Sequence, residues 1–267
     1  MRLALVLVLL LATPFLAGCA QDPAPGSGTT PNGTASGTPA ATTSGTPANG
    51  GSGQCVSTDG THRAKNPVVV FDTTQGTIRL TLFCDKAPVT TQHIEKLVEA
   101  GCYDGTRFHR VVRGFMDQGG DPLSKDDSKA SSWGTGGPAN CNQSPDTIVE
   151  EYYCTDGTIS TATPAGNAAP TQCDAHGGLG LKHQGAGVWS MARTSVPHSS
   201  GSQFFLTAAD AAFLDGRYTV FGHTADDAST QVVLKINNLT CKSQPCQDPN
   251  SRTDTLVTIT KATVEWG

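Results

Sequence analysis

The sequence has few aromatic residues and no dense cluster of positive charge. Aromatic side chains make up 6% of its 267 residues, charged side chains 15%, and the formal net charge is -5. A nucleic-acid-binding surface normally carries a basic patch or stripe, so nucleic acid is not expected as a partner. The long apolar run, residues 3–12, is too short to span a bilayer as a helix.

The cysteines lack the spacing of a metal site. No CxxC pair occurs among the nine cysteines, and no histidine stands at ligand spacing from two of them. We therefore expect no metal. If Cys19 is modified, an even number remains, which in an exported protein indicates disulfides. These remaining residues are Cys55, Cys84, Cys102, Cys141, Cys154, Cys173, Cys241 and Cys246.

Two disulfide pairings can be suggested from position alone. Cys241 and Cys246 flank a short loop and could form a local bridge. Cys84 and Cys102 bracket a predicted helix and could also pair. The other four cysteines cannot be connected from the sequence, because spacing alone does not fix connectivity.

The N-terminal quarter of the chain has the features of an export signal and a tether. Residues 1–18 contain one arginine followed by the apolar run, and 16–19 read LAGC, which resembles a bacterial lipobox with Cys19 as the lipid-attachment residue. The alternative is an ordinary secretory signal. Residues 19–62 are rich in Gly, Ser, Thr and Pro and predict a flexible tether. We expect a domain at 63–267 that is lipid-anchored to the cell membrane on its extracytoplasmic side.

The globular part shows short apolar segments separated by turns. Strands are predicted at residues 67–72, 77–83, 108–112, 187–192, 203–207, 218–222 and 256–264. Helical spacing predicts one helix from Pro88 to near Gly101 and another over 230–236. Residues 123–180 predict a long loop with little core. This strand-rich pattern favours a mainly β fold, an antiparallel sheet or barrel with two helices.

The stretch FHRVVRGFMDQGGDP, residues 108–122, combines an arginine and a glutamine with large apolar side chains. Alternate side chains of a strand share a face, so Arg110 is expected beside Phe108 and Val112 and opposite Val111. A barrel core would not accept an arginine, which predicts a surface groove with an apolar wall. That wall would consist of Phe115, Met116, Phe205 and Leu214.

Six blocks in this order resemble the cyclophilins, a family of peptidyl-prolyl cis/trans isomerases. They are FHRVVRGFMDQGGDP, GTGGP, LKHQGAGVWSMAR, GSQFFLT, FLDGRYTVFG and LVTITKATVEW. The likeness covers residues 68–266 and is closest to exported bacterial members. It implies an eight-stranded antiparallel β-barrel capped by two α-helices, in which residues 139–180 form a long, disulfide-rich insertion.

The resemblance also implies the site residues. Arg110, Phe115 and Gln118 would be catalytic, on proline-containing polypeptides and without a cofactor. The substrate-binding residues would be Met116, Ala192, Arg193, Gln203, Phe205, Phe213, Leu214 and Tyr218. Arg113 and Asp117 are charges that the resemblance does not explain.

The expected function is acceleration of X–Pro bond rotation by a monomeric enzyme that assists the folding of exported proteins. An alternative is a holdase that binds proline peptides with little turnover, which the long insertion favours slightly. A surface lipoprotein with a degenerate barrel is a further alternative. The retained Arg110, Phe115, Gln118 and Phe205 argue against it.

Overall fold

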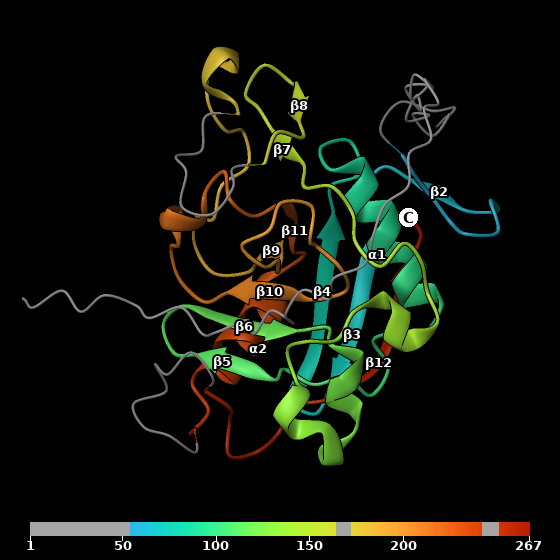
Figure 1. The fold of residues 1–267 in the computed structure, drawn as a ribbon, viewed down its shortest axis with the longest axis vertical. Coiled ribbons are helices and arrows are strands. Elements are labelled where there is room, and N and C mark those ends of the chain that lie inside the picture. The colour runs from blue at the N-terminus through green and yellow to red at the C-terminus, as the bar shows by residue number, and fades with distance from the viewer. Residues whose placement is uncertain (1–53, 164–171, 242–250) are drawn as a thin grey trace, which may run out of the picture. The chain divides into compact units, whose positions relative to one another are not determined.

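The computed structural model of the protein describes residues 54–163, 172–241 and 251–267 (Figure 1). The predicted signal peptide, the predicted lipid-attachment residue Cys19 and most of the predicted tether lie outside these residues, as does Cys246. In the described ranges, none of the helices has the length and apolar character needed to cross a bilayer.

Within the described residues, eight antiparallel strands form one curled sheet in the order β12-β3-β4-β11-β9-β10-β6-β5 (Figure 1). The strands are β3 (Val68–Thr73), β4 (Gly76–Leu82), β5 (Arg110–Val112), β6 (Met116–Gly119), β9 (Val188–Met191), β10 (Phe204–Thr207), β11 (Val220–Thr224) and β12 (Ile259–Glu265). Backbone hydrogen bonds join the two edges, among them Phe108 N to Val257 O (3.0 Å) and Ile259 N to Thr106 O (2.8 Å). The predicted eight-stranded antiparallel fold is confirmed.

The strands form because their apolar residues alternate. In β4, Ile78, Leu80 and Leu82 point into the core and are fully buried, while the residues between them are more exposed. The core of the curled sheet is aromatic at its centre, where the Phe71 and Phe204 rings stack at 5.4 Å and Trp189 meets both edge-on. This core lies inside the sheet and leaves the outer face of several strands available for other contacts.

Two helices accompany the sheet: α1 (Pro88–Glu99) packs against β12, and α2 (Asp227–Asn237) packs against β4 and β6 (Figure 1). As predicted, α1 has Pro88 in its first turn and ends before Gly101, whose φ of +68° suits glycine. The helix α2 is capped by Asp226, whose carboxylate accepts from Ser229 N at 2.7 Å.

The predicted long loop contains short ordered elements. They are η1 (Pro122–Lys125), η2 (Asp127–Ser132), η3 (Pro138–Cys141), β7 (Tyr152–Tyr153), β8 (Ile159–Ser160) and η4 (Asp174–His176). Another short pair, β1 (Cys55–Val56) and β2 (Arg63–Ala64), precedes the main sheet. Ordered structure therefore begins before residue 63, where the predicted tether ends.

Three disulfides lie within the described residues: Cys55–Cys84, Cys102–Cys141 and Cys154–Cys173. The suggested Cys84–Cys102 pair is wrong. The two residues stand at opposite ends of α1, whose twelve residues extend about 18 Å, whereas a disulfide needs Cα atoms within about 7 Å. The suggested Cys241–Cys246 pair involves a residue outside the described ranges.

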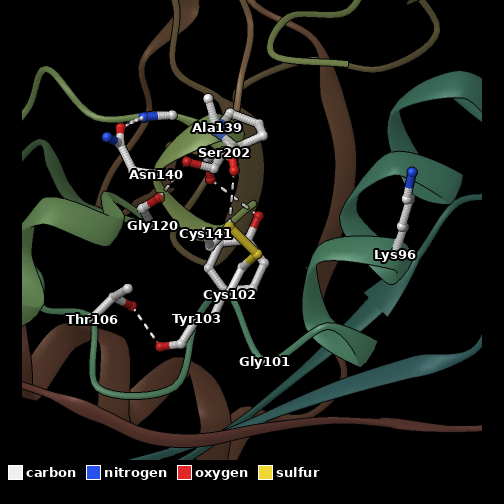
Figure 2. The surroundings of a disulfide bond; sticks show 12 residues. Lys96, Gly101, Cys102, Tyr103, Thr106, Gly120, Ala139, Asn140, Cys141 and Ser202 are labelled. Atoms are coloured by element: carbon white, nitrogen blue, oxygen red, sulfur yellow. Dashed lines mark hydrogen bonds between the residues drawn. A yellow bond between two sulfur atoms is a disulfide. The ribbon is translucent and has the colours of Figure 1, made fainter. Parts of the chain in front are cut away.

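The Cys102–Cys141 disulfide stands where several elements meet (Figure 2). Next to it, the Tyr103 hydroxyl donates to Ser202 O (3.0 Å), just before β10. The Ser202 hydroxyl donates in turn to Gly120 O (2.7 Å), just after β6. The bridge therefore holds η3 against the turn after α1, beside the ends of β6 and β10.

Buried polar contacts join the β5–β6 hairpin to the C-terminal end of α2. The Asp117 carboxylate is fully buried and accepts from Asn237 Nδ2 at 2.8 Å. Asn237 Oδ1 accepts from Gly114 N (2.7 Å) in the hairpin turn. Arg113 donates to Asn238 O (3.2 Å) and Leu239 O (3.0 Å), which satisfies carbonyls at the negative end of the helix dipole. Both charges that the resemblance leaves unexplained thus serve the docking of α2.

We predict that Asp117→Asn makes the protein more stable relative to wild type as the pH rises. Burial raises the pKa of Asp117 to about 8, although the hydrogen bond from Asn237 acts in the opposite direction. Between pH 4 and pH 8 the unfolded chain loses this proton and the folded chain keeps it, so wild type loses at most about 1.4 kcal/mol for each pH unit. Urea unfolding at several pH values measures the effect, and a pH-independent difference would contradict it.

We also predict that replacing Cys102 and Cys141 together by serine lowers the free energy of unfolding by about 2–4 kcal/mol. The bridge closes a loop with a sequence separation of 39 residues. A matched control is the double serine variant of Cys154 and Cys173 at the tip of the insertion. Denaturant unfolding with and without reductant measures both, and reductant should weaken wild type more than either variant.

Candidate active site

The pairing of three neighbouring strands brings the predicted polar residues into one row. Arg110 on β5 lies opposite Gln118 on β6, and Gln118 lies opposite Phe205 on β10. The next pair, Val112 opposite Met116, lies on the same outer face. The prediction that Phe108 shares this outer face with Arg110 is wrong. It is fully buried in the main core, because the regular alternation begins only at Arg110.

Arg110 is half-buried and held by its neighbours. Its Nη1 donates to Gln118 Oε1 at 3.1 Å and lies 3.9 Å from Met116 Sδ. Burial lowers the pKa of the Arg110 guanidinium, and Tyr218 partly offsets this. An arginine stays protonated even so, so the groove presents a fixed, partly desolvated cation.

The polar edge of the groove continues as a chain of side-chain amides. Gln118 Nε2 donates to Gln203 Oε1 (3.0 Å), and Gln203 Nε2 donates to Gly136 O (2.9 Å) in the GTGGP segment. A Cβ atom at Gly136 would lie 2.0 Å from Asp121 Oδ1, so only glycine fits there. Arg110 is thereby connected through the side-chain amides of Gln118 and Gln203 to the GTGGP loop.

A separate apolar cluster lies beside this polar edge. Its buried members are Val112, Met116, Phe205, Ala211 and Leu214, with Phe115, Ala192 and Tyr218 packed against them. The cluster is distinct from the main core inside the sheet. An apolar surface beside a single cation can bind a small apolar ring and leave the amide attached to that ring near the guanidinium.

Three of the predicted substrate-binding residues lie around the same cluster. Phe213, in η5 (Ala212–Leu214), is 66% exposed and its ring centre lies 5.3 Å from that of Phe115. Tyr218 meets Phe205 edge-on at 5.8 Å, and the Arg193 guanidinium lies over the Tyr218 ring at 5.4 Å. The structure thus gathers the predicted residues Phe213, Tyr218 and Arg193 at the edge of the cluster.

Ala192 supplies backbone rather than side-chain chemistry. Its N–H donates to Gln203 O at 2.9 Å, which fixes the segment after β9 against the start of β10. Gln118, Ala192 and Gln203 also line a cavity of about 420 Å³ that adjoins the cluster. The groove therefore has two compartments that share one polar wall.

Sequence reasoning missed a buried group behind the apolar cluster. His183 stacks on Phe205 with ring centres 5.7 Å apart, and its ring nitrogens lie 2.9 Å from Asp215 Oδ1 and 3.0 Å from Ser190 Oγ. The spacing resembles a Ser-His-Asp triad. Ser190 and His183 are at most 1% exposed, so no substrate reaches them. We therefore interpret this group of side chains as support for the Phe205 ring. The sequence did not indicate it, because its members are single residues in separate blocks of the chain.

In the described part of the chain, one group of side chains has the proximity of a metal site: Cys55, Cys84 and Glu95. The two cysteines are joined in a disulfide, so their sulfur atoms are not thiolates that could bind a metal. The group lies away from Arg110, among core residues.

Comparisons with known proteins agree with this geometry. Residues 68–264 match the family profile described as "Cyclophilin type peptidyl-prolyl cis-trans isomerase/CLD". The chain is 35% identical over 158 residues to the peptidyl-prolyl cis-trans isomerase-like 1 protein of Rhizopus delemar, which is 59% of this chain and 73% of that protein. It is 34% identical over 169 residues to the peptidyl-prolyl cis-trans isomerase cypE of Dictyostelium discoideum, which is 63% of this chain and 83% of the relative.

A solved structure shares the fold. The crystal structure of a cyclophilin type peptidyl-prolyl cis-trans isomerase of Cryptosporidium parvum aligns with a TM-score of 0.52 and 24% identity, over 76% of this chain and 99% of the other. The profile match runs from the first residue of β3 almost to the end of β12 and includes the whole groove. This chain belongs to the cyclophilin-type peptidyl-prolyl cis-trans isomerases and is an enzyme of that class.

Proposed function

We propose that the groove on β5, β6 and β10 is the catalytic site and that Arg110 stabilises the twisted X–Pro amide. The contact from Arg110 to Gln118, directly beside the separate apolar cluster, is the observation that supports this most. The cluster around Phe205 would hold the proline ring. Gln118, Gln203 and the backbone at Ala192 would hold the flanking peptide.

The proposed mechanism follows from the barrier of the reaction. Rotation about an X–Pro bond costs about 18–20 kcal/mol because the amide has partial double-bond character. In the twisted state the proline nitrogen becomes pyramidal and exposes a lone pair. A guanidinium that donates to this nitrogen favours the twisted amide over both planar isomers, which is what lowers the barrier. No covalent bond breaks, so no nucleophile is needed.

We further propose that the substrates are exported polypeptides and that the enzyme acts at the extracytoplasmic side of the cell membrane. The signal-like residues 1–18, with Cys19 as the lipid-attachment site, support an anchor. The three disulfides of the described residues support an oxidising compartment. Proline isomerisation limits the folding of many chains, so an isomerase placed there would assist newly exported proteins.

The proposed role of Arg110 predicts that Arg110→Ala lowers kcat/KM for a proline tetrapeptide by about 10²-fold or more. Arg110→Lys should recover little of it, because an ammonium lacks the planar fork of donors. A matched control is Arg79→Ala on β4, whose exposed side chain pairs with Glu265 on β12. Cis-to-trans rates measure all three. Peptide binding with no acceleration by wild type would instead indicate a holdase.

The proposed anchor predicts that Cys19→Ser abolishes incorporation of labelled palmitate. The kcat/KM of this variant should equal that of wild type, because the groove lies in residues 110–218. A variant beginning at Gln54, which lacks both the apolar run and Cys19, should stay soluble and fold under oxidising conditions. Incorporation of palmitate that survives Cys19→Ser, or none in wild type, would rule out lipidation at this residue.

A further inference from the structure

A carboxylate from the insertion organises a loop at the edge of the groove. Glu150 is fully buried, and its two oxygens accept from Ser200 Oγ (3.0 Å), Thr163 Oγ1 (2.8 Å) and His198 N (2.8 Å). His198 Nδ1 lies 3.2 Å from the same carboxylate. Burial alone would raise the pKa of Glu150, but these hydrogen bonds and the charge of Arg193 lower it below its usual value.

The loop at residues 194–200 depends on that carboxylate. His198 has a φ of +58°, a left-handed conformation that costs energy for a residue other than glycine. The hydrogen bond from its N–H to Glu150 keeps it there. A backbone bond from Ile148 N to Ser200 O (2.8 Å) joins the same two segments beside Glu150. The insertion therefore fixes the end of the loop at His198 and Ser200, while Thr194 and Ser199 bond to each other within the loop.

The loop and the insertion together wall the cavity of about 420 Å³. The loop contributes Thr194 and Ser199, and the insertion contributes Asn140, Asp146 and Thr147. The other lining residues are glycines, residues with hydroxyl or amide side chains, Arg193 and Ala192. Ala192 is the one lining residue with an apolar side chain. Because Gln118 and Gln203 form its inner wall, a peptide held beside Arg110 would project a flanking side chain into this cavity.

We propose that Glu150 is a positioning residue for substrate specificity and acts through the loop at residues 194–200. With the loop held in this way, the cavity selects proline polypeptides that carry a polar, hydrogen-bonding side chain next to the X–Pro pair. Glu150 contacts no substrate itself. A large apolar side chain in this cavity would leave hydroxyl and amide groups without partners, which disfavours it. The inference rests on the Arg110 groove proposed above.

The test uses Glu150→Gln in the full chain. The glutamine amide has only one acceptor oxygen, so it cannot accept from all the hydrogen-bond donors around Glu150. The backbone N–H of His198 cannot rotate to find another acceptor. We measure kcat and KM on peptides with Ser, Asn or Leu at the position before or after the X–Pro pair. We expect KM for the Ser and Asn peptides to rise by about three- to tenfold, with kcat and the Leu peptides nearly unchanged.

The adjacent Glu151 gives a matched control. It is an equally buried carboxylate of the insertion, but it accepts from Val89 N (3.1 Å) and Thr90 N (2.8 Å) at the start of α1. Glu151→Gln should lower the melting temperature without changing selectivity. Ser200→Ala, a milder change at the same contact, should give the Glu150→Gln pattern more weakly.

Three results separate the possibilities. An equal loss for all peptides in Glu150→Gln, or the same pattern in Glu151→Gln, would overturn the proposal, because Glu150 would then be only structural. An unchanged preference in both Glu150→Gln and Ser200→Ala would overturn it as well. Failure of the Arg110 groove is distinguished by the wild-type rate and by Arg110→Ala, which are measured on the same peptides.

Discussion

Arg110, Gln118 and Phe205 lie side by side because of the pairing register of β5, β6 and β10. A slip of one residue in β6 would turn Gln118 into the core and Asp117 toward solvent, since the side-chain period of a strand is two. This row of three residues contributes to the apolar cluster, to the chain of side-chain amides that ends at Gly136, and to the wall of the cavity. The register is in turn fixed by the buried residues of the opposite face, such as Val111 and Leu206.

The hairpin that carries Arg110 is held on its inner side by polar side chains that look misplaced in the sequence. Asp117 binds Asn237, Asn237 binds the Gly114 turn, and Arg113 satisfies the carbonyls at the end of α2. A hairpin with only apolar packing could slide or tilt, whereas hydrogen bonds define its position closely. We interpret these contacts as the reason that a short strand of three residues can present an arginine in a fixed place.

The sequence predicted most of the sheet, because β3, β4 and β12 show clear alternation or apolar runs. It missed β6, since Asp117 and Gln118 interrupt the apolar pattern and the partner of Asp117 comes from α2, far along the chain. The site residues could be predicted because six sequence blocks occur in the order found in the family, whereas no single residue identified the site. Cys84 and Cys102 could not be assigned correctly, because disulfide partners depend on distances through space. The support of Phe205 by His183 was hidden for the same reason.

Under the two proposals above, chemistry and selectivity occupy different parts of this enzyme. Arg110 and the cluster around Phe205 are held by the main sheet and α2, whereas the insertion and the loop at residues 194–200 line part of the cavity beyond Gln203. Buried carboxylates and a disulfide join the insertion to α1, to the turn after α1 and to the loop at residues 194–200. If Arg110 acts on the amide as we propose, changes in the insertion can alter which peptides bind while that arginine keeps its place.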